Sequence, residues 1–297
     1  MKRINIIFVC AVLMIAGLSA CSKKDADGVS GATVKSEENV HELSETAQEP
    51  EKTETVIKAV DPEIEKLNRV LMSMTDRCKA AIPNGDPEEF LADLKVVLDA
   101  EKNHPQDEVS LYILVDKNHN IGPESNPKHI VKLVPNDAYV INKNNLSLRA
   151  DAEASLREMA YAAKADGITL TVSSTYRSYE RQLEVFDYWV QIDGLEEAER
   201  ESARAGTSQH QLGTVIDFGS IDESYAETDE CKWLNEHAAD YGWSLSFPMG
   251  YEDVTGYKWE SWHFRYIGRE ACAFQKKWFS DIQQFMLEFI DGWKNAE

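Results

Sequence analysis

The amino-acid sequence predicts an α+β domain, a small antiparallel sheet with flanking helices, preceded by a helical hairpin. Candidate strands and amphipathic helices mix in the second half of the 297-residue chain without the regular alternation of parallel βαβ units. Neither a G-x-G-x-x-G nor a P-loop motif occurs in the sequence. A doubly wound nucleotide-binding fold is therefore disfavoured.

The first residues are typical of a bacterial export signal. Two basic residues precede an apolar run at positions 6–18, and small residues then lead into Cys21. The apolar run is shorter than the ~20 residues that a membrane-spanning helix needs. The string LSAC, ending at Cys21, resembles a lipobox. We expect residues 1–20 to be a lipoprotein signal peptide and Cys21 to anchor the exported protein to the bacterial cell membrane, on its periplasmic or outer face.

Residues 21–60 differ in composition from the rest of the chain. They are rich in acidic residues, Ser and Thr and almost free of aromatic residues, so they cannot bury enough apolar surface to fold. We predict a flexible acidic tether. The whole chain has a formal net charge of -21, which disfavours nucleic acid as a partner.

Residues 61–105 are predicted to form the helical hairpin. Asp61 and Asp86 are each followed by proline, as expected of a helix N-cap before a proline at the first helical position. Apolar residues at helical spacing follow both, and a Pro-Asn-Gly turn separates them. No chemistry is visible in this segment.

The compact domain is predicted at residues 106–297. The run SLYILVD at 110–116 and the run ITLTVS at 168–173 have the length and composition of buried strands. Between them, residues 149–166 form an amphipathic helix that Gly167 ends. We predict further strands at 214–218 and 262–266, and further helices after Arg177, at 230–241 and at 268–293.

With Cys10 in the signal peptide and Cys21 as the lipid anchor, three cysteines remain, at positions 78, 231 and 272. They form neither a disulfide framework nor the close pairs of a structural zinc site. Sequence leaves open whether Cys231 and Cys272 pair.

Two short motifs carry candidate metal ligands. His210 and Asp217 lie on either side of a glycine turn, and Glu260 precedes His263 by three residues. Two imidazoles and one carboxylate are good zinc ligands and leave one coordination position open, as catalytic zinc sites require. Glu260 is then left over as a general base for the attack of water. Arg177 is a fixed cation suited to stabilising an oxyanion or binding a carboxylate.

Each of these spacings can also arise in an unrelated domain. Two histidines and one carboxylate also form the facial triad of non-haem iron enzymes. The predicted export and the spare carboxylate of Glu260 favour hydrolysis.

At this point the sequence resembles a known family. SQHQLGTVID at 208–217 is similar to S-x-H-x-x-G-x-A-x-D, and ESWH at 260–263 is similar to E-x-W-H. These are motifs of the D-alanyl-D-alanine carboxypeptidases of peptidase group M15 (M15B), of the vancomycin-resistance accessory carboxypeptidase type. The resemblance covers about residues 111–270. Val215 stands where alanine is usual in this motif. This difference affects packing beside the metal and does not replace a ligand.

The resemblance implies a Hedgehog/DD-peptidase-like fold and one zinc ion per chain. His210, Asp217 and His263 would bind the zinc, Glu260 would be the general base and later proton donor, and Arg177 would polarise the scissile carbonyl. Five further side chains are expected to contact the substrate or line its pocket: Ser208, Gln182, Trp262, Ser174 and Tyr176.

The expected function is zinc-dependent removal of the C-terminal D-alanine from peptidoglycan stem peptides by a monomeric enzyme. Two alternatives stay open. The chain can be an L,D-carboxypeptidase that cuts tetrapeptides, because the same residues would serve either substrate. It can also be a non-catalytic lipoprotein that binds the cell wall.

Overall fold

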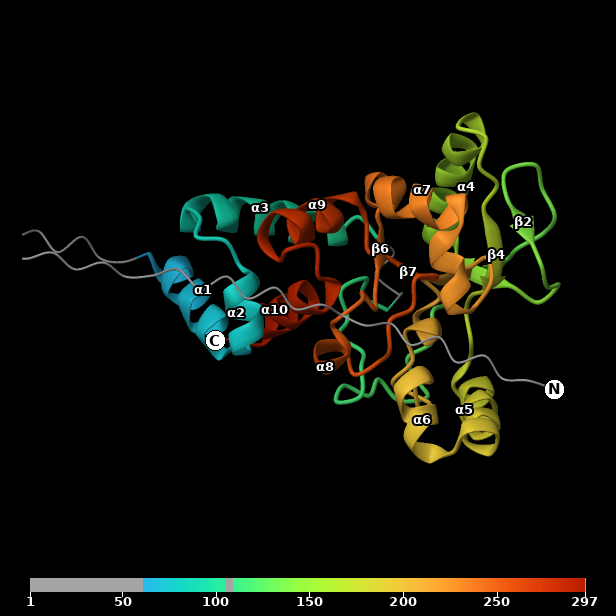
Figure 1. Cartoon of the computed structure of the whole chain (residues 1–297). Helices are drawn as coiled ribbons and strands as arrows, with labels where there is room; N and C mark the ends of the chain where they lie inside the picture. The colour runs from blue at the N-terminus through green and yellow to red at the C-terminus, as the bar shows by residue number, and fades with distance from the viewer. Residues whose placement is uncertain (1–60, 105–108, 297) are drawn as a thin grey trace, which may run out of the picture. The chain divides into compact units, whose positions relative to one another are not determined.

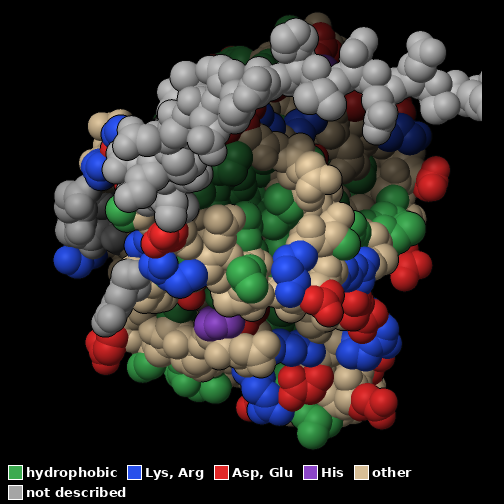
Figure 2. All heavy atoms as spheres, turned by 90° about the vertical axis from the view of Figure 1, so that its left-hand side faces the viewer, with side chains coloured by type: hydrophobic (Ala, Val, Ile, Leu, Met, Phe, Trp, Pro, Cys, Tyr) green, Lys and Arg blue, Asp and Glu red, His purple; other side chains and the backbone are tan. Residues whose placement is uncertain are grey.

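The computed structural model describes residues 61–104 and 109–296. The predicted signal peptide, Cys21 and the acidic tether lie outside the described residues and stay predictions. Among the described residues, no helix has the length and apolar character needed to cross a membrane. In Figure 1 a group of helices gathers on the left and a small sheet with its own helices lies on the right. On the face in Figure 2, acidic and basic side chains are interspersed, as expected of a solvated surface.

A five-stranded sheet forms the centre of the domain. In spatial order its strands are β2 (Val140–Ile141), β4 (Thr171–Ser174), β5 (Val215–Phe218), β7 (His263–Tyr266) and β6 (Trp243–Leu245). The β2–β4 pair is parallel and the other three pairs are antiparallel. A separate antiparallel ribbon joins β1 (Ile130–Lys132) and β3 (Ser147–Arg149). The expected small, mainly antiparallel sheet is confirmed.

One hydrophobic core lies between this sheet and the helices α4 (Ala150–Ala165) and α7 (Asp229–His237). Side chains alternate along a strand, so Ile216, Phe218 and Phe264 point into this core from one face of the sheet. The predicted helix at 149–166 is confirmed, and Gly167 follows it with a φ of +83°. The residues between these core positions therefore point to the opposite face.

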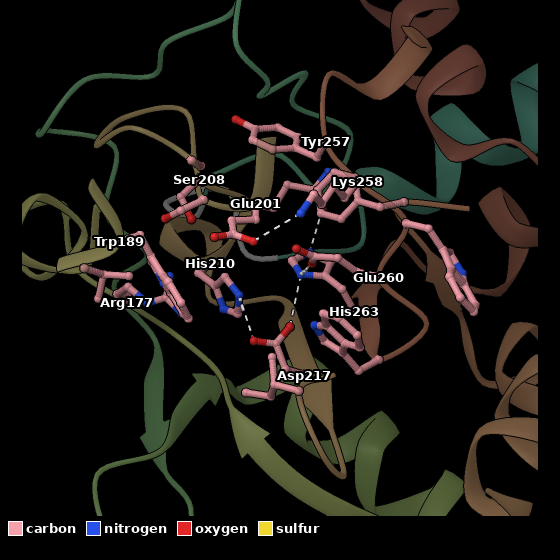
Figure 3. A pocket seen from close by; sticks show the side chains of 18 of the residues that line it. Arg177, Trp189, Glu201, Ser208, His210, Asp217, Tyr257, Lys258, Glu260 and His263 are labelled. Carbon is pink, nitrogen blue, oxygen red and sulfur yellow. Dashed lines mark hydrogen bonds and ion pairs between the residues drawn. The ribbon is translucent and has the colours of Figure 1, made fainter. Parts of the chain in front are cut away.

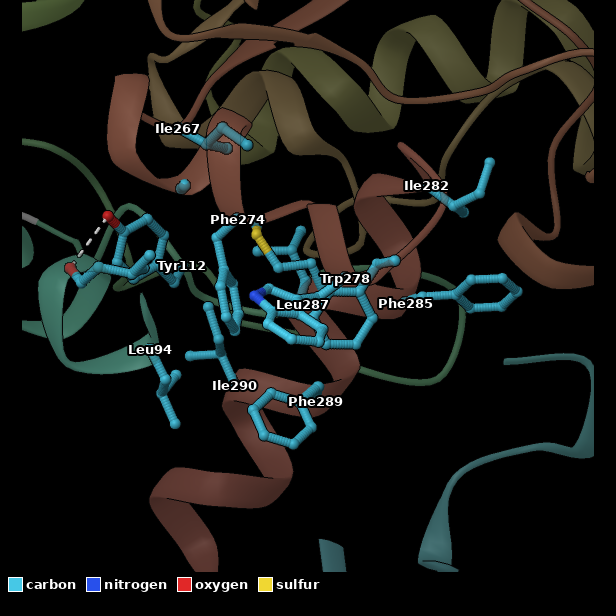
Figure 4. Close-up of a cluster of buried hydrophobic side chains, with 14 of the residues drawn as sticks. Leu94, Tyr112, Ile267, Phe274, Trp278, Ile282, Phe285, Leu287, Phe289 and Ile290 are labelled. Atoms are coloured by element: carbon cyan, nitrogen blue, oxygen red, sulfur yellow. Dashed lines mark hydrogen bonds between the residues drawn. The ribbon is translucent and has the colours of Figure 1, made fainter. Parts of the chain in front are cut away.

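A second hydrophobic core holds the helical group together. It joins α1 (Pro62–Ser73), α2 (Asp76–Ala81), α3 (Pro87–Glu101), α9 (Arg269–Trp278) and α10 (Gln283–Asn295). Phe274, Trp278 and Phe289 lie together in this core (Figure 4). The Phe90 ring centroid lies 5.2 Å from that of Phe274, 5.0 Å from Trp278 and 5.1 Å from Phe289. The predicted break between two helices is confirmed, with α2 as an additional short helix. The N-terminal helices thus pack on the C-terminal helix pair.

The prediction of a strand at residues 110–116 is wrong. The segment is buried as expected, but these described residues form no strand. The guanidinium of Arg265 instead donates hydrogen bonds to the carbonyl oxygens of Leu111 and Ile113, at 2.8 and 2.9 Å. A buried arginine therefore satisfies backbone groups that a neighbouring strand would otherwise satisfy.

The remaining elements connect the strands. They are α5 (Tyr179–Asp193), α6 (Leu195–Glu201), α8 (Glu252–Thr255) and 3₁₀ helices at Gln209–Leu212, Glu223–Glu227 and Ala238–Tyr241. The three cysteines in the described part of the chain are buried free thiols. Cys231 belongs to the sheet core and Cys272 to the helical core, so they do not pair.

Glu230 ties helix α7 to the sheet. Its Oε1 accepts a hydrogen bond from the backbone N–H of Thr171 at 2.6 Å. Burial raises the pKa of Glu230 from 4.5 to about 7. Between these values the folded protein binds more protons than the unfolded chain. The free energy of unfolding therefore falls as the pH rises from 4.5 to about 7.

We expect Glu230→Gln to remove this pH dependence, because an amide oxygen still accepts from Thr171 but does not ionise. At pH 8 the variant should be more stable than wild type by about 1–2 kcal/mol, a value discounted for the partial exposure of the side chain. Urea denaturation at pH 5 and pH 8 measures the difference. A variant less stable than wild type at pH 8 would contradict the prediction.

Candidate metal centre

The pairing of β5 with β7 brings two candidate ligands together. Asp217 lies directly opposite His263 in this antiparallel register. Because their neighbours Ile216 and Phe264 face the sheet core, Asp217 and His263 face the other side. The two sequence motifs thus meet on one face of the sheet.

His210 reaches the same place through a tight turn. The 3₁₀ helix Gln209–Leu212 ends at Gly213, which has a φ of +69°. This conformation is rare for residues with a Cβ, and a Cβ there would lie 2.7 Å from the side chain of Ile130. The glycine therefore permits the reversal that leads directly into β5 and sets His210 beside Asp217.

The three side chains converge (Figure 3). His210 Nε2 lies 3.2 Å from Asp217 Oδ2, and His263 Nδ1 lies 3.1 Å from Asp217 Oδ1. One candidate ligand atom from each residue lies within 4.8 Å of the other two, and all three residues are buried. The structure thus brings together the three ligands that the sequence predicted.

In His210 and in His263, one ring nitrogen donates a hydrogen bond and the nitrogen that faces the cluster is left for a metal. His210 Nδ1 donates to the carbonyl oxygen of Thr175 at 2.7 Å, so Nε2 keeps its lone pair. His263 Nε2 donates to Gln209 Oε1 at 3.2 Å, so Nδ1 is the free nitrogen. Asp217 Oδ1 is buried and accepts no hydrogen bond from the described residues. Two imidazole nitrogens and an unsatisfied carboxylate oxygen fit a zinc ion.

The electrostatics of the cluster favour a bound cation. Burial lowers the pKa of His210 to about 4. Burial alone would raise the pKa of Asp217, but His210 and His263 outweigh it and hold this pKa well below its ordinary value. Burial also opposes charge on His263, yet the nearby carboxylates of Asp217 and Glu260 raise its pKa to about 9. Without a metal, a proton on His263 neutralises part of the buried negative charge.

Glu260 lies beside the cluster. Its Oε2 is 3.3 Å from His263 Nδ1, and its side chain is 14% exposed, on the wall of a cavity. Burial raises the pKa of Glu260, which makes its carboxylate a stronger base. The position suits proton transfer to and from a group held at the metal ligands.

Arg177 lies on the same cavity wall, on the side of His210 (Figure 3). Its guanidinium donates to Gln182 Oε1 at 2.8 Å and to Ser174 Oγ at 3.2 Å. Its backbone N–H donates to the carbonyl oxygen of His210 at 3.1 Å. Burial lowers the pKa of Arg177, whereas the carboxylates of Asp217 and Glu260 favour its charged form. The cation is therefore held rigidly beside the ligands.

The cavity has a volume of about 390 Å³. Ser208 and Trp262 line it, as the sequence predicted for substrate contacts. Ser174, Tyr176 and Gln182 are not among the described residues of its wall. Gln182 is fully buried, and its amide lies between Arg177 and the carbonyl oxygen of Ala203. These three contacts stay predictions, and the structure shows two of the three side chains supporting Arg177.

Sequence reasoning missed several residues of the cavity wall. They are Trp189, Glu201, Phe247, Tyr257, Lys258 and Trp259. The helical pattern of α5 gives no sign that Trp189 lies on the cavity wall. Lys258 and Trp259 directly precede Glu260, so their place next to the motif was the available signal.

Fold and donor set together define a metallopeptidase-type domain, and comparisons with known proteins agree. Residues 145–269 match the VanY family, described as D-alanyl-D-alanine carboxypeptidase. The putative carboxypeptidase YodJ of Bacillus subtilis (strain 168) is 37% identical over 131 residues, which are 42% of this chain and 48% of YodJ.

Two solved structures resemble the fold. The LdcB LD-carboxypeptidase has a TM-score of 0.55 and 29% identity, covering 61% of this chain and 86% of LdcB. The D,D-dipeptidase VanXYg, solved with a D-Ala-D-Ala phosphinate analogue, has a TM-score of 0.52 and 26% identity, covering 61% of this chain and 72% of VanXYg.

The segment of residues 145–269 is thus similar to the VanY family of D-alanyl-D-alanine carboxypeptidases. The chain spans about half the length of the curated relatives that it matches.

Proposed function

We propose that this protein is a zinc-dependent D-alanyl-D-alanine carboxypeptidase that removes the C-terminal D-alanine from peptidoglycan stem peptides. The observation that carries the proposal is one cavity in which His210, Asp217 and His263 converge beside Glu260 and Arg177. The match of residues 145–269 to the VanY family supports both the metal and the substrate class.

The three ligands would hold one zinc ion per chain. Bound zinc lowers the pKa of water and polarises a carbonyl group. Glu260 accepts the proton of the attacking water and later delivers it to the departing amine of D-alanine. Arg177 stabilises the negative charge that develops on the carbonyl oxygen, and Gln182 and Ser174 hold its guanidinium in place.

Glu260→Gln should lower kcat by about a thousandfold or more, because the amide cannot accept the proton. Zinc content should stay at about one ion per chain, since Glu260 is not a ligand. Elemental analysis and hydrolysis of a pentapeptide ending in D-Ala-D-Ala measure the two quantities.

His210→Ala is the contrasting variant and His237→Ala its matched control. His237 lies partly exposed on α7, outside the ligand cluster. His210→Ala should lose both zinc and activity, whereas His237→Ala should keep both. Full activity of Glu260→Gln would remove Glu260 from the mechanism, and wild-type protein without zinc would favour a cell-wall-binding function.

The similarity to LdcB supports an L,D-carboxypeptidase as the second candidate. Purified protein incubated with a pentapeptide should yield the tetrapeptide and free D-alanine, and trimming should stop there. Mass spectrometry of the products distinguishes D,D- from L,D-carboxypeptidase activity. Efficient conversion of the tetrapeptide to a tripeptide would establish L,D activity in place of the D,D activity proposed.

A further inference from the structure

A chain of buried polar side chains runs from His263 to the C-terminal helix α10. It begins with the hydrogen bond from His263 Nε2 to Gln209 Oε1, at 3.2 Å. Ser246 Oγ donates to the same amide oxygen at 2.8 Å. Two donors therefore orient one acceptor.

This series of buried polar side chains continues onto α10. Ser246 Oγ has one proton, and it faces two acceptors: Gln209 Oε1 and, at 3.1 Å, Gln283 Oε1, so the two amide oxygens share this donor. Gln283 Nε2 donates to the carbonyl oxygen of Ser244 at 3.2 Å. The exposed fractions are 6% for Gln209, 2% for Ser246 and 1% for Gln283. The groups are shielded from solvent, so their hydrogen bonds to one another matter more than they would at the surface.

The amide oxygen of Gln209 determines which nitrogen of His263 is free. A neutral imidazole carries its proton on either nitrogen, and the nitrogen that carries it cannot bind a metal. An acceptor at Nε2 holds the proton there and leaves Nδ1 for the metal. His210 is oriented by the backbone carbonyl of Thr175, which no substitution removes, whereas His263 depends on a side chain.

We propose that Gln209, Ser246 and Gln283 are positioning residues that fix the ring orientation of His263 through the hydrogen bond at its Nε2 atom. Gln283 lies beyond residues 145–269, the part of the chain that matches the family. The C-terminal helix thus supports the metal centre. The inference rests on the proposed function only in taking His263 as a metal ligand.

The first test compares two substitutions at Gln209. Gln209→Met has a similar volume and no acceptor, so zinc affinity should fall about 10-fold or more, measured by competition with a chelator. Gln209→Glu keeps an acceptor at Nε2 and should stay close to wild type. Equal affinities of wild type and Gln209→Met would overturn the proposal.

The second test addresses α10 and has a matched control. Gln284 is the next residue and is also buried. Its side-chain amide donates hydrogen bonds to Asp116 and Glu288. Gln283→Met and Gln284→Met each remove one buried amide, so both lower the melting temperature. Only Gln283→Met should also weaken zinc binding severalfold. Equal zinc affinities of these two variants would overturn the part assigned to α10.

The third test needs neither zinc nor substrate. In protein labelled with ¹⁵N-histidine, the Nε2–H proton of His263 should give a slowly exchanging NMR signal. The signal should persist in Gln284→Met and broaden in Gln209→Met. A wild type that neither binds zinc nor cleaves peptides would refute the proposed function and still report on this network. An unchanged signal in Gln209→Met would refute the network itself.

Discussion

The antiparallel pairing of β5 with β7 is the constraint on which the rest of the site depends. It sets Asp217 opposite His263 while Ile216 and Phe264 enter the sheet core. If β7 slipped by one residue, His263 would turn toward the hydrophobic core and Phe264 toward the cavity. The burial that stabilises the sheet therefore also selects the register that the metal ligands require.

The pairing of β5 with β7 also brings two carboxylates together in the buried ligand cluster. The carboxylates of Asp217 and Glu260 both lie beside Nδ1 of His263, whose pKa rises to about 9 as a result. Burial of a carboxylate is unfavourable unless a cation or hydrogen-bond donors compensate it. A proton on His263 compensates in part, and a metal ion would replace that proton. The cluster is thus arranged for a cation, and Arg177 adds a second fixed positive charge.

The sequence predicted strands β5 and β7 and the candidate ligands that they carry, because a strand pattern and a motif coincide at Asp217 and at His263. Burial of residues 110–116 was also predicted, but their pairing was not. An apolar run indicates that a segment is buried, whereas its hydrogen-bond partner here is Arg265, 154 residues from Leu111 along the chain. Likewise the order of residues placed Gln182 near Arg177, but only the fold shows that its amide supports the guanidinium.

The N-terminal helices carry no candidate site residues, yet they pack against helices that contact the metal-site region. Phe90 packs against rings of α9 and α10, so the helical core holds α10 against the sheet domain. From α10, Gln283 reaches Ser246, whose backbone N–H donates to the carbonyl oxygen of His263. The helical segment and the metal centre are therefore linked through packing and buried hydrogen bonds. If Gln283 positions His263 as proposed, loosening the helical core would change the orientation of the His263 ring.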